Sequence, residues 1–92
     1  MKPAMERDRL EAPLQHGTAV IAVYVPARDE ESAGRYYPTK VMVRFMGQVL
    51  EPRDVRDAET LHINQTVAIS YRIGKSGKVY VDTAKALGKA KQ

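Results

Sequence analysis

The sequence predicts a mostly β protein, a small antiparallel barrel of four to five strands of the Greek-key/OB-like or SH3-like kind. Two segments, Thr39–Met46 and Gln65–Ile73, alternate apolar and polar residues with a period of two, as half-buried strands do. A third segment, Thr18–Val25, is an apolar, β-branched run. The chain has 92 residues, which is enough for one modest hydrophobic core and therefore for one domain.

The N-terminal residues 1–15 are charged with both signs, and we expect a flexible or short helical arm there. The run Thr18–Val25 is apolar on both faces, which indicates a central strand or one whose outer face is covered. Pro26 ends this strand because proline cannot donate to the ladder. The polar stretch Ala27–Arg35 is expected to form an exposed loop or the tip of a hairpin.

The alternation in Thr39–Met46 sorts its side chains onto two faces. Val41, Val43 and Phe45 are predicted to point into the core, and Lys40, Met42, Arg44 and Met46 to point outward. The charged segment Glu51–Glu59 that follows predicts a single helical turn or a long loop, with Pro52 well placed for a first helical turn.

A second hairpin joins Gln65–Ile73 to a strand at Lys78–Asp82. If both Ile73 and Val79 face inward, they must lie opposite each other, which leaves a three-residue loop with Gly77 in third place. Glycine adopts the left-handed conformation that such a loop requires. The same register predicts that Tyr71 lies beside Val81 on the core face and that Arg72 faces Tyr80 on the outer face.

The C-terminal segment is a basic tail that we expect to be helical from Ala84 to Leu87 and to stop at Gly88. This gives a division into an arm at 1–15, one barrel domain at 16–87 and a tail at 88–92.

Charge is unevenly distributed along the chain, whose net charge is +4. From Ser70 to Gln92 there are six lysines and arginines against Asp82 alone, which favours an anionic partner. A tail that merely keeps the protein in solution is the alternative for the last four residues. The sequence contains no cysteine, and we expect a cytoplasmic protein without disulfides, membrane span or signal peptide.

The candidate binding residues are basic and aromatic side chains, most of them on the outer faces of the strands, with Tyr36 at the end of the Arg28–Arg35 loop and Lys75 in the hairpin loop. Lysines and arginines neutralise phosphates and tyrosines stack on bases, which is what sequence-tolerant single-strand binding needs. The candidate nucleic-acid-binding residues are Lys40, Arg44, Arg72, Lys75, Lys78, Tyr80 and Tyr36. The alternative is an ordinary solvated sheet face, with Arg72 lying over Tyr80 as a cross-strand pair.

Met42 and Met46 on the same outer face indicate an adaptable contact surface, most simply the interface of a homodimer. The alternative is that they fill space under the charged segment Arg53–Glu59.

No catalytic, metal or cofactor site is predicted. His16 and His62 lie far apart and have no partner at ligand spacing. The triplet Gly74-Lys75-Ser76 is a fragment of a phosphate-binding loop, but Ile69 stands where the motif needs its first glycine, and a strand follows instead of a helix. A ribonuclease-like activity is disfavoured because acid–base partners are missing.

Two stretches resemble the small single-stranded-DNA-binding proteins of filamentous bacteriophages. Residues 34–38 (GRYYP) lead into the strand Lys40–Phe45, and Thr66–Ala86 forms a closing hairpin with a basic end. The resemblance implies an OB-like barrel, a two-fold dimer and cooperative coating of single strands, with Arg72, Lys78, Tyr80 and Tyr36 as contacts. The N-terminal extension and the acidic segment Glu51–Glu59 depart from that family's pattern.

We therefore expect a non-catalytic nucleic-acid-binding protein that prefers single-stranded DNA or RNA. The alternative is a small protein-binding module, an adaptor or inhibitor of the kind found in mobile elements. Its surface would combine Met42 and Met46 with the charged segment Arg53–Glu59. No membrane partner is expected.

Overall fold

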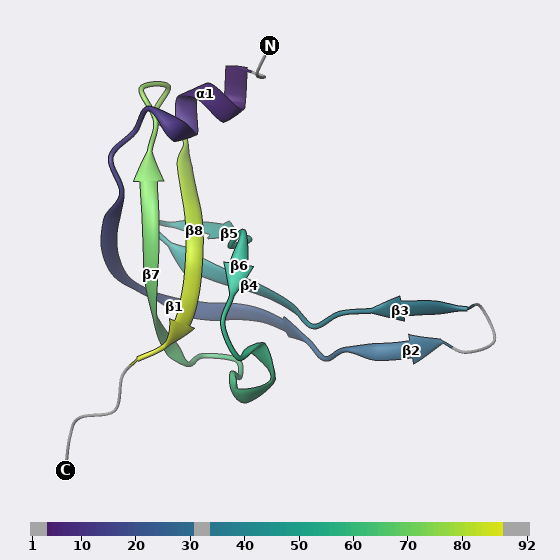
Figure 1. Cartoon of the computed structure of the whole chain (residues 1–92). Helices are drawn as coiled ribbons and strands as arrows, with labels where there is room; N and C mark the ends of the chain where they lie inside the picture. Colours follow the sequence, from purple (N-terminus) through teal and green to yellow (C-terminus); the bar gives the residue numbers. More distant parts are fainter. Residues whose placement is uncertain (1–3, 31–33, 88–92) are drawn as a thin grey trace.

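The computed structural model describes residues 4–30 and 34–87, which fold mostly into β-strands (Figure 1). The elements are α1 (Ala4–Leu10), β1 (Gln15–Val25), β2 (Arg28–Glu30), β3 (Arg35–Tyr37), β4 (Lys40–Phe45), β5 (Gln48–Leu50), β6 (Asp54–Val55), the 3₁₀ turn η2 (Ala58–Thr60), β7 (Thr66–Ile73) and β8 (Val79–Ala86). The mostly β class predicted from the sequence is confirmed.

Six strands form one curled sheet in the order β5-β4-β1-β7-β8-β6. All neighbours are antiparallel except β6, which runs parallel to β8. β5 and β6 stand at opposite ends of this order, yet only the residues between Leu50 and Asp54 connect them, a span of at most about 14 Å. The sheet must therefore curl until its two edges approach. Arg53 N–H reinforces this approach by donating to the Val81 carbonyl at 3.0 Å.

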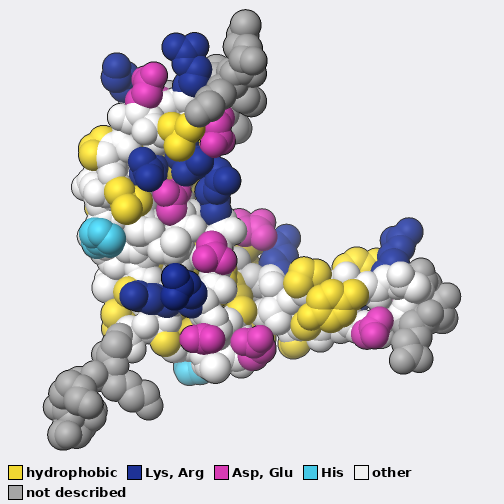
Figure 2. All heavy atoms as spheres, in the orientation of Figure 1, with side chains coloured by type: hydrophobic (Ala, Val, Ile, Leu, Met, Phe, Trp, Pro, Cys, Tyr) yellow, Lys and Arg dark blue, Asp and Glu magenta, His cyan; other side chains and the backbone are white. Residues whose placement is uncertain are grey.

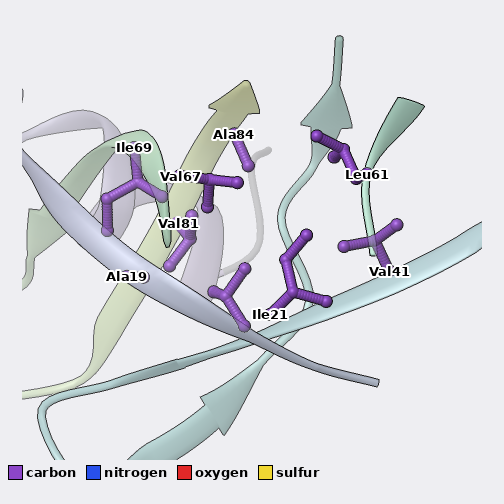
Figure 3. Close-up of a cluster of buried hydrophobic side chains, with 9 residues drawn as sticks. Ala19, Ile21, Val41, Leu61, Val67, Ile69, Val81 and Ala84 are labelled. Carbon is purple, nitrogen blue, oxygen red and sulfur yellow. The ribbon is translucent and has the colours of Figure 1, made fainter. Parts of the chain in front are cut away.

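The hydrophobic core lies on the concave side of this curled sheet. Ile21, Val43 and Val67, from three adjacent strands, have the largest fully buried side chains. Val81 and Leu61 complete the cluster from β8 and from the segment before β7 (Figure 3). The period-two alternation predicts the inner face of β4 correctly, since Val41 and Val43 are buried and their neighbours are more exposed.

The β7–β8 hairpin has the predicted register. Ile73 pairs with Val79, Arg72 with Tyr80 and Tyr71 with Val81. The loop closes with a hydrogen bond of 2.8 Å from Gly77 N–H to the Gly74 carbonyl, and Gly77 has a φ of 90°. Glycine adopts such a conformation without the steric penalty that a side chain would bring. The predicted register and the predicted role of Gly77 in the loop are both confirmed.

The predicted helix at Ala84–Leu87 is wrong, because β8 continues to Ala86. A bulge explains why the pattern was missed. Tyr71 pairs with Val81 but the preceding Ser70 pairs with Thr83, so Asp82 is an extra residue in β8. Because of the bulge, the next buried residue after Val81 is Ala84, three positions later instead of two. The simple alternation of buried and more exposed residues therefore ends at Asp82. Residues 88–92 of the predicted tail lie outside the described residues.

The segments predicted as loops contain short strands. Ala27–Arg35 was expected to be a loop or hairpin tip, and the structure has a two-stranded hairpin of β2 and β3 there that projects from the body (Figure 1). Residues 28–30 and 35–37 of this hairpin, together with Gly34, are called the arm below. This arm is a different segment from the N-terminal residues 1–15. The segment Glu51–Glu59 contains β6, followed by η2. The parallel pairing of β6 with β8, absent from the prediction, brings this segment to the sheet edge.

Candidate nucleic-acid interface

The seven predicted nucleic-acid-binding residues fall into two groups. Lys40, Arg44 and Tyr36 lie on β4 and on the arm. The other four, Arg72, Lys75, Lys78 and Tyr80, belong to the β7–β8 hairpin. β1 and β7 separate β4 from β8 in the sheet, a distance of about 14 Å along it. The two groups therefore do not form one continuous face.

The arm presents aromatic rings and guanidinium groups. Arg28 pairs with Tyr37 across the two strands, and its guanidinium carbon lies 4.6 Å from the centre of the Tyr37 ring. Arg35 donates from Nη1 to the Tyr37 hydroxyl at 3.4 Å. Tyr36 lies at the next position, whose side chain points to the other face of the two-stranded ladder, and it is 66% exposed. Figure 2 shows hydrophobic side chains gathered along the arm, next to Lys and Arg.

A crevice of about 340 Å³ lies where the arm joins the sheet. Its walls combine apolar rings with two cationic side chains and one carboxylate, from Val25, Pro26, Arg28, Tyr37, Pro38, Thr39, Lys40 and Glu51. Lys40 follows β3 after only two residues, so the arm leads directly into the outer face of β4. The crevice thus connects the aromatic arm to the basic strand.

The outer face of β4 alternates basic and apolar residues. Lys40 and Arg44 are exposed, and Met42 between them is half-buried. Met46 does not continue this face, which corrects the prediction. It has a φ of 54° and, with Gly47 at 73°, forms the two-residue turn between β4 and β5. Positive φ at both central residues matches the twist of the strands that the turn joins.

Two of the hairpin residues are engaged in contacts within the chain. Arg72 donates from Nε to Asp82 at 2.8 Å and from Nη1 to the Ala12 carbonyl at 2.8 Å. Tyr80 donates its hydroxyl to the Asp8 carboxylate at 2.9 Å. These contacts hold the N-terminal segment against the outer face of β7 and β8. Lys75 is exposed in the turn, and Lys78 Nζ lies 5.7 Å from the centre of the Tyr80 ring.

The sequence reasoning missed the residues that dock α1. Arg9 is buried, and it donates to Glu6 at 2.8 Å and to Asp82 at 3.4 Å. The hydrogen bond from Arg9 to Glu6 raises the pKa of the guanidinium. Asp8 accepts from the Ser76 hydroxyl at 2.6 Å. The sequence signal was weak, because Asp8 and Arg9 belong to a run of mixed charge that is typical of solvated helices.

Hydrogen bonding shifts the acidity of both partners in the Asp8 contact. The Ser76 and Tyr80 hydroxyls donate to Asp8 and lower the pKa of its carboxyl, and these effects exceed the opposing effect of burial. Burial raises the pKa of Tyr80, and the hydrogen bond to Asp8 raises it further. The ionised carboxylate with a neutral phenol is therefore the stable pairing at neutral pH.

The two histidines lie in different parts of the fold. His62 Nδ1 lies 3.1 Å from the Ile63 carbonyl, and His16 is exposed on β1. Residues 4–30 and 34–87 contain no group of three or more His, Cys, Asp or Glu side chains that could hold a metal ion. In the same residues, no helix is long and apolar enough to span a membrane.

No family model, no curated protein and no solved structure matches this chain.

Proposed function

We propose that this chain is a non-catalytic protein that binds single-stranded nucleic acid with the arm and the outer face of β4. The observation that carries the proposal is the exposed aromatic and cationic arm, which leads directly into Lys40 and Arg44. Tyr36 and the Arg28–Tyr37 pair supply surfaces on which unpaired bases stack. Lys40 and Arg44 supply charges for the phosphates.

Single strands fit this surface better than a duplex does. Stacking on an exposed tyrosine requires a base face, which a duplex hides between neighbouring base pairs. The arm is narrow and two-stranded, so a flexible strand can follow it into the crevice at its root. The basic residues are few and mixed with Asp29 and Glu30, which favours moderate, sequence-tolerant affinity.

The strand order supports an OB-like barrel as the finer description of the fold. If β5 and β6 count as one bent strand, the barrel has five strands in chain order: β1, β4, β5–β6, β7 and β8. The first strand (β1) then pairs with the second (β4) and the fourth (β7), and the third (β5–β6) runs parallel to the fifth (β8). The arm then corresponds to the loop between the first two strands, one of the loops with which OB-folds contact oligonucleotides. The likeness to filamentous-phage single-stranded-DNA-binding proteins agrees with this proposal.

A protein-binding role is the second candidate, and the turn between β4 and β5 favours it. Met46 is 59% exposed and Val49 is 45% exposed, so this edge of the sheet presents apolar side chains to solvent. A homodimer through this edge is the simplest form of such an interface. Sedimentation analysis of Val49→Asp beside the unchanged chain tests it, since a buried charge would dissociate the dimer.

Substitutions on the arm and on β4 test the proposed function. We expect Tyr36→Ala to weaken binding of a fluorescent oligo-dT of about 20 nucleotides by roughly fivefold or more, because each stacked base contributes about 1–3 kcal/mol. Arg44→Ala removes a phosphate contact, so its main effect is a shallower dependence of affinity on salt.

Lys85→Ala is the matched control, because Lys85 is exposed on β8 and lies outside the proposed surface. Fluorescence anisotropy measures all three variants. If Tyr36→Ala and Arg44→Ala bind like Lys85→Ala, the arm and β4 are not the binding surface.

A further inference from the structure

The turn between β7 and β8 holds a carboxylate that comes from the other end of the chain. Asp8 Oδ2 accepts from the Ser76 hydroxyl at 2.6 Å and from the Tyr80 hydroxyl at 2.9 Å. Asp8 Oδ1 lies 3.3 Å from the Ser76 backbone nitrogen, which donates to it. Three donors from one hairpin thus converge on a single anionic group.

Gly74 leaves room for that group. A Cβ at this position would collide with the Asp8 carboxylate. Gly74 does not have a positive φ, so its backbone conformation does not require glycine. Its role here is therefore to allow an anion to approach the turn closely.

The surroundings of the turn are cationic. Lys75 is exposed within the turn, and the Lys78 ammonium lies over the Tyr80 ring. Hydroxyl and amide donors beside lysines form the kind of concave site that binds phosphate oxygens. It differs from the helix-forming phosphate loop excluded from the sequence, because here the donors belong to a β-hairpin.

We propose that the hairpin turn formed by Gly74, Ser76 and Tyr80 is a phosphate-binding site, which Asp8 of α1 occupies when no ligand is bound. The natural occupant would be a phosphate group of the bound strand, and this part rests on the proposed function. Nucleic acid and α1 then compete for the hairpin. Binding of a phosphate displaces the Asp8 carboxylate and adds Lys75 and Lys78 to the contact surface.

The way in which α1 is attached makes such displacement feasible. Described contacts of α1 with the rest of the chain include the Asp8 hydrogen bonds, the Arg9–Asp82 ion pair and an ion pair of 3.7 Å between Glu6 and Arg53. Leu10, by contrast, is 40% exposed. The Glu6–Arg53 pair is partly exposed, so salt and competing anions weaken it, whereas the Arg9–Asp82 pair is better shielded and can hold Arg9 in place while Asp8 leaves the turn.

Asp8→Asn tests the proposal, with Glu11→Gln as the control. Both changes remove one negative charge from the N-terminal segment, but Glu11 is exposed and lies outside the site. We expect Asp8→Asn to bind oligo-dT roughly 3–10-fold more tightly than Glu11→Gln, because apparent affinity rises with the fraction of molecules whose site is open. Equal affinities of the two variants would overturn competition by Asp8.

Inorganic phosphate tests the site separately from the nucleic acid. In proton–nitrogen correlation spectra of Asp8→Asn, phosphate should shift the Ser76 and Gly77 amides, whereas equal concentrations of chloride should not. The unchanged chain should respond less, because the charged Asp8 carboxylate competes with phosphate for the same donors more strongly than a neutral amide does. If the phosphate shifts appear but oligo-dT does not bind, the proposed function fails and the anion site stands.

A double variant tests whether phosphate binds at this turn in a chain that is still folded. Adding Gly74→Ala to Asp8→Asn places a methyl group where the anion would lie. We expect it to abolish both the phosphate shifts and the gain in affinity, with the spectral dispersion of β1 and β4 retained. Persistence of the shifts in the double variant would show that phosphate binds elsewhere and would overturn the proposal.

Discussion

Asp82 accepts hydrogen bonds from two guanidinium groups on the outer side of β8. Arg72 donates at 2.8 Å from the neighbouring strand, and Arg9 donates at 3.4 Å from α1. The side chain of Asp82 is only 15% exposed, so solvent screens these contacts incompletely. The bulge in β8 makes Asp82 the extra residue of the strand, at the point where the N-terminal segment meets the sheet.

Replacing Asp82 should destabilise the docking of the N-terminal segment. Asp82→Asn keeps the size of the side chain but removes the carboxylate that pairs with Arg72 and, beside Glu6, with Arg9, and we expect a loss of about 1–3 kcal/mol in the free energy of unfolding. Urea unfolding measures it. Asp54→Asn, at an exposed position of β6, is the control and should change stability little. Equal midpoints for both variants would show that Asp82 does not anchor the segment.

The Asp8 contact should depend on pH in a defined direction. The pKa of Asp8 is lowered from its ordinary value of 3.8 by the donors of Ser76 and Tyr80. A carboxyl whose pKa falls on folding stabilises the folded state above the unfolded pKa, and this contribution is lost as pH falls through the folded pKa. Acidification below about pH 4 should therefore release the Asp8 side chain from the β7–β8 turn.

The Ser76 amide resonance reports this release. It should titrate below about pH 4 in the unchanged chain and should not titrate in Asp8→Asn. A titration that persists in Asp8→Asn would assign it to another group.

At the scale of elements, the arm is separate from the hydrophobic core. The buried residues of the main core cluster belong to β1, β4, β7, β8 and the segment before β7, and none belongs to β2 or β3. Val25 pairs with Lys40 where the arm begins, so the two strands that carry it already lie side by side. The arm can therefore change without disturbing the packing of the sheet.

Shortening the arm should remove binding and preserve the fold. We suggest replacing residues 26–39 with Asn-Gly, which forms the two-residue turn that suits adjacent antiparallel strands. Binding of oligo-dT should weaken by about tenfold or more, since one stacked base alone contributes about 1–3 kcal/mol. Circular dichroism and the urea midpoint verify folding. Undiminished binding by a folded shortened chain would show that the arm is not needed.

Local patterns explain which elements could be predicted. The register of β7 and β8 could be predicted, because two requirements lead to the same pairing. Ile73 and Val79 must both face the core, and Gly77 must take the left-handed position of the turn. The continuation of β8 could not be predicted, because the bulge at Asp82 shifts the buried positions by one. β6 is two residues long, too short to show any period.

At the scale of the molecule, the site was predicted by residue type better than by arrangement. Lys40 and Arg44 were predicted from outward-facing positions and lie on β4, and Tyr36, which was predicted at the end of a loop, lies on β3 of the arm. The engagement of Arg72 and Tyr80 was not predicted, because it depends on Asp8 and Arg9, far away along the chain. Sequence periodicity describes faces of strands and contains no information on which distant segment covers them.

The described residues place basic side chains in two regions, one on the arm and β4 and the other on the β7–β8 hairpin, in a chain whose net charge is +4. Figure 2 shows Lys and Arg side chains interspersed with Asp and Glu. One region, on the arm and β4, is open to a ligand. In the other, on the β7–β8 hairpin, Arg72 and Tyr80 are engaged by the N-terminal segment through Ala12 and Asp8. A strand that first binds the arm could then compete with Asp8 for the hairpin, which would couple the two regions.

Binding of a labelled single strand across a salt series tests the central claim most directly. Anisotropy should report binding of oligo-dT that is tighter than binding of a duplex of the same length. The logarithm of the affinity should fall linearly with the logarithm of the salt concentration, with a slope of about −0.7 for each phosphate contacted. No binding at low salt, or equal affinity for the duplex, would contradict single-strand binding by the arm and β4.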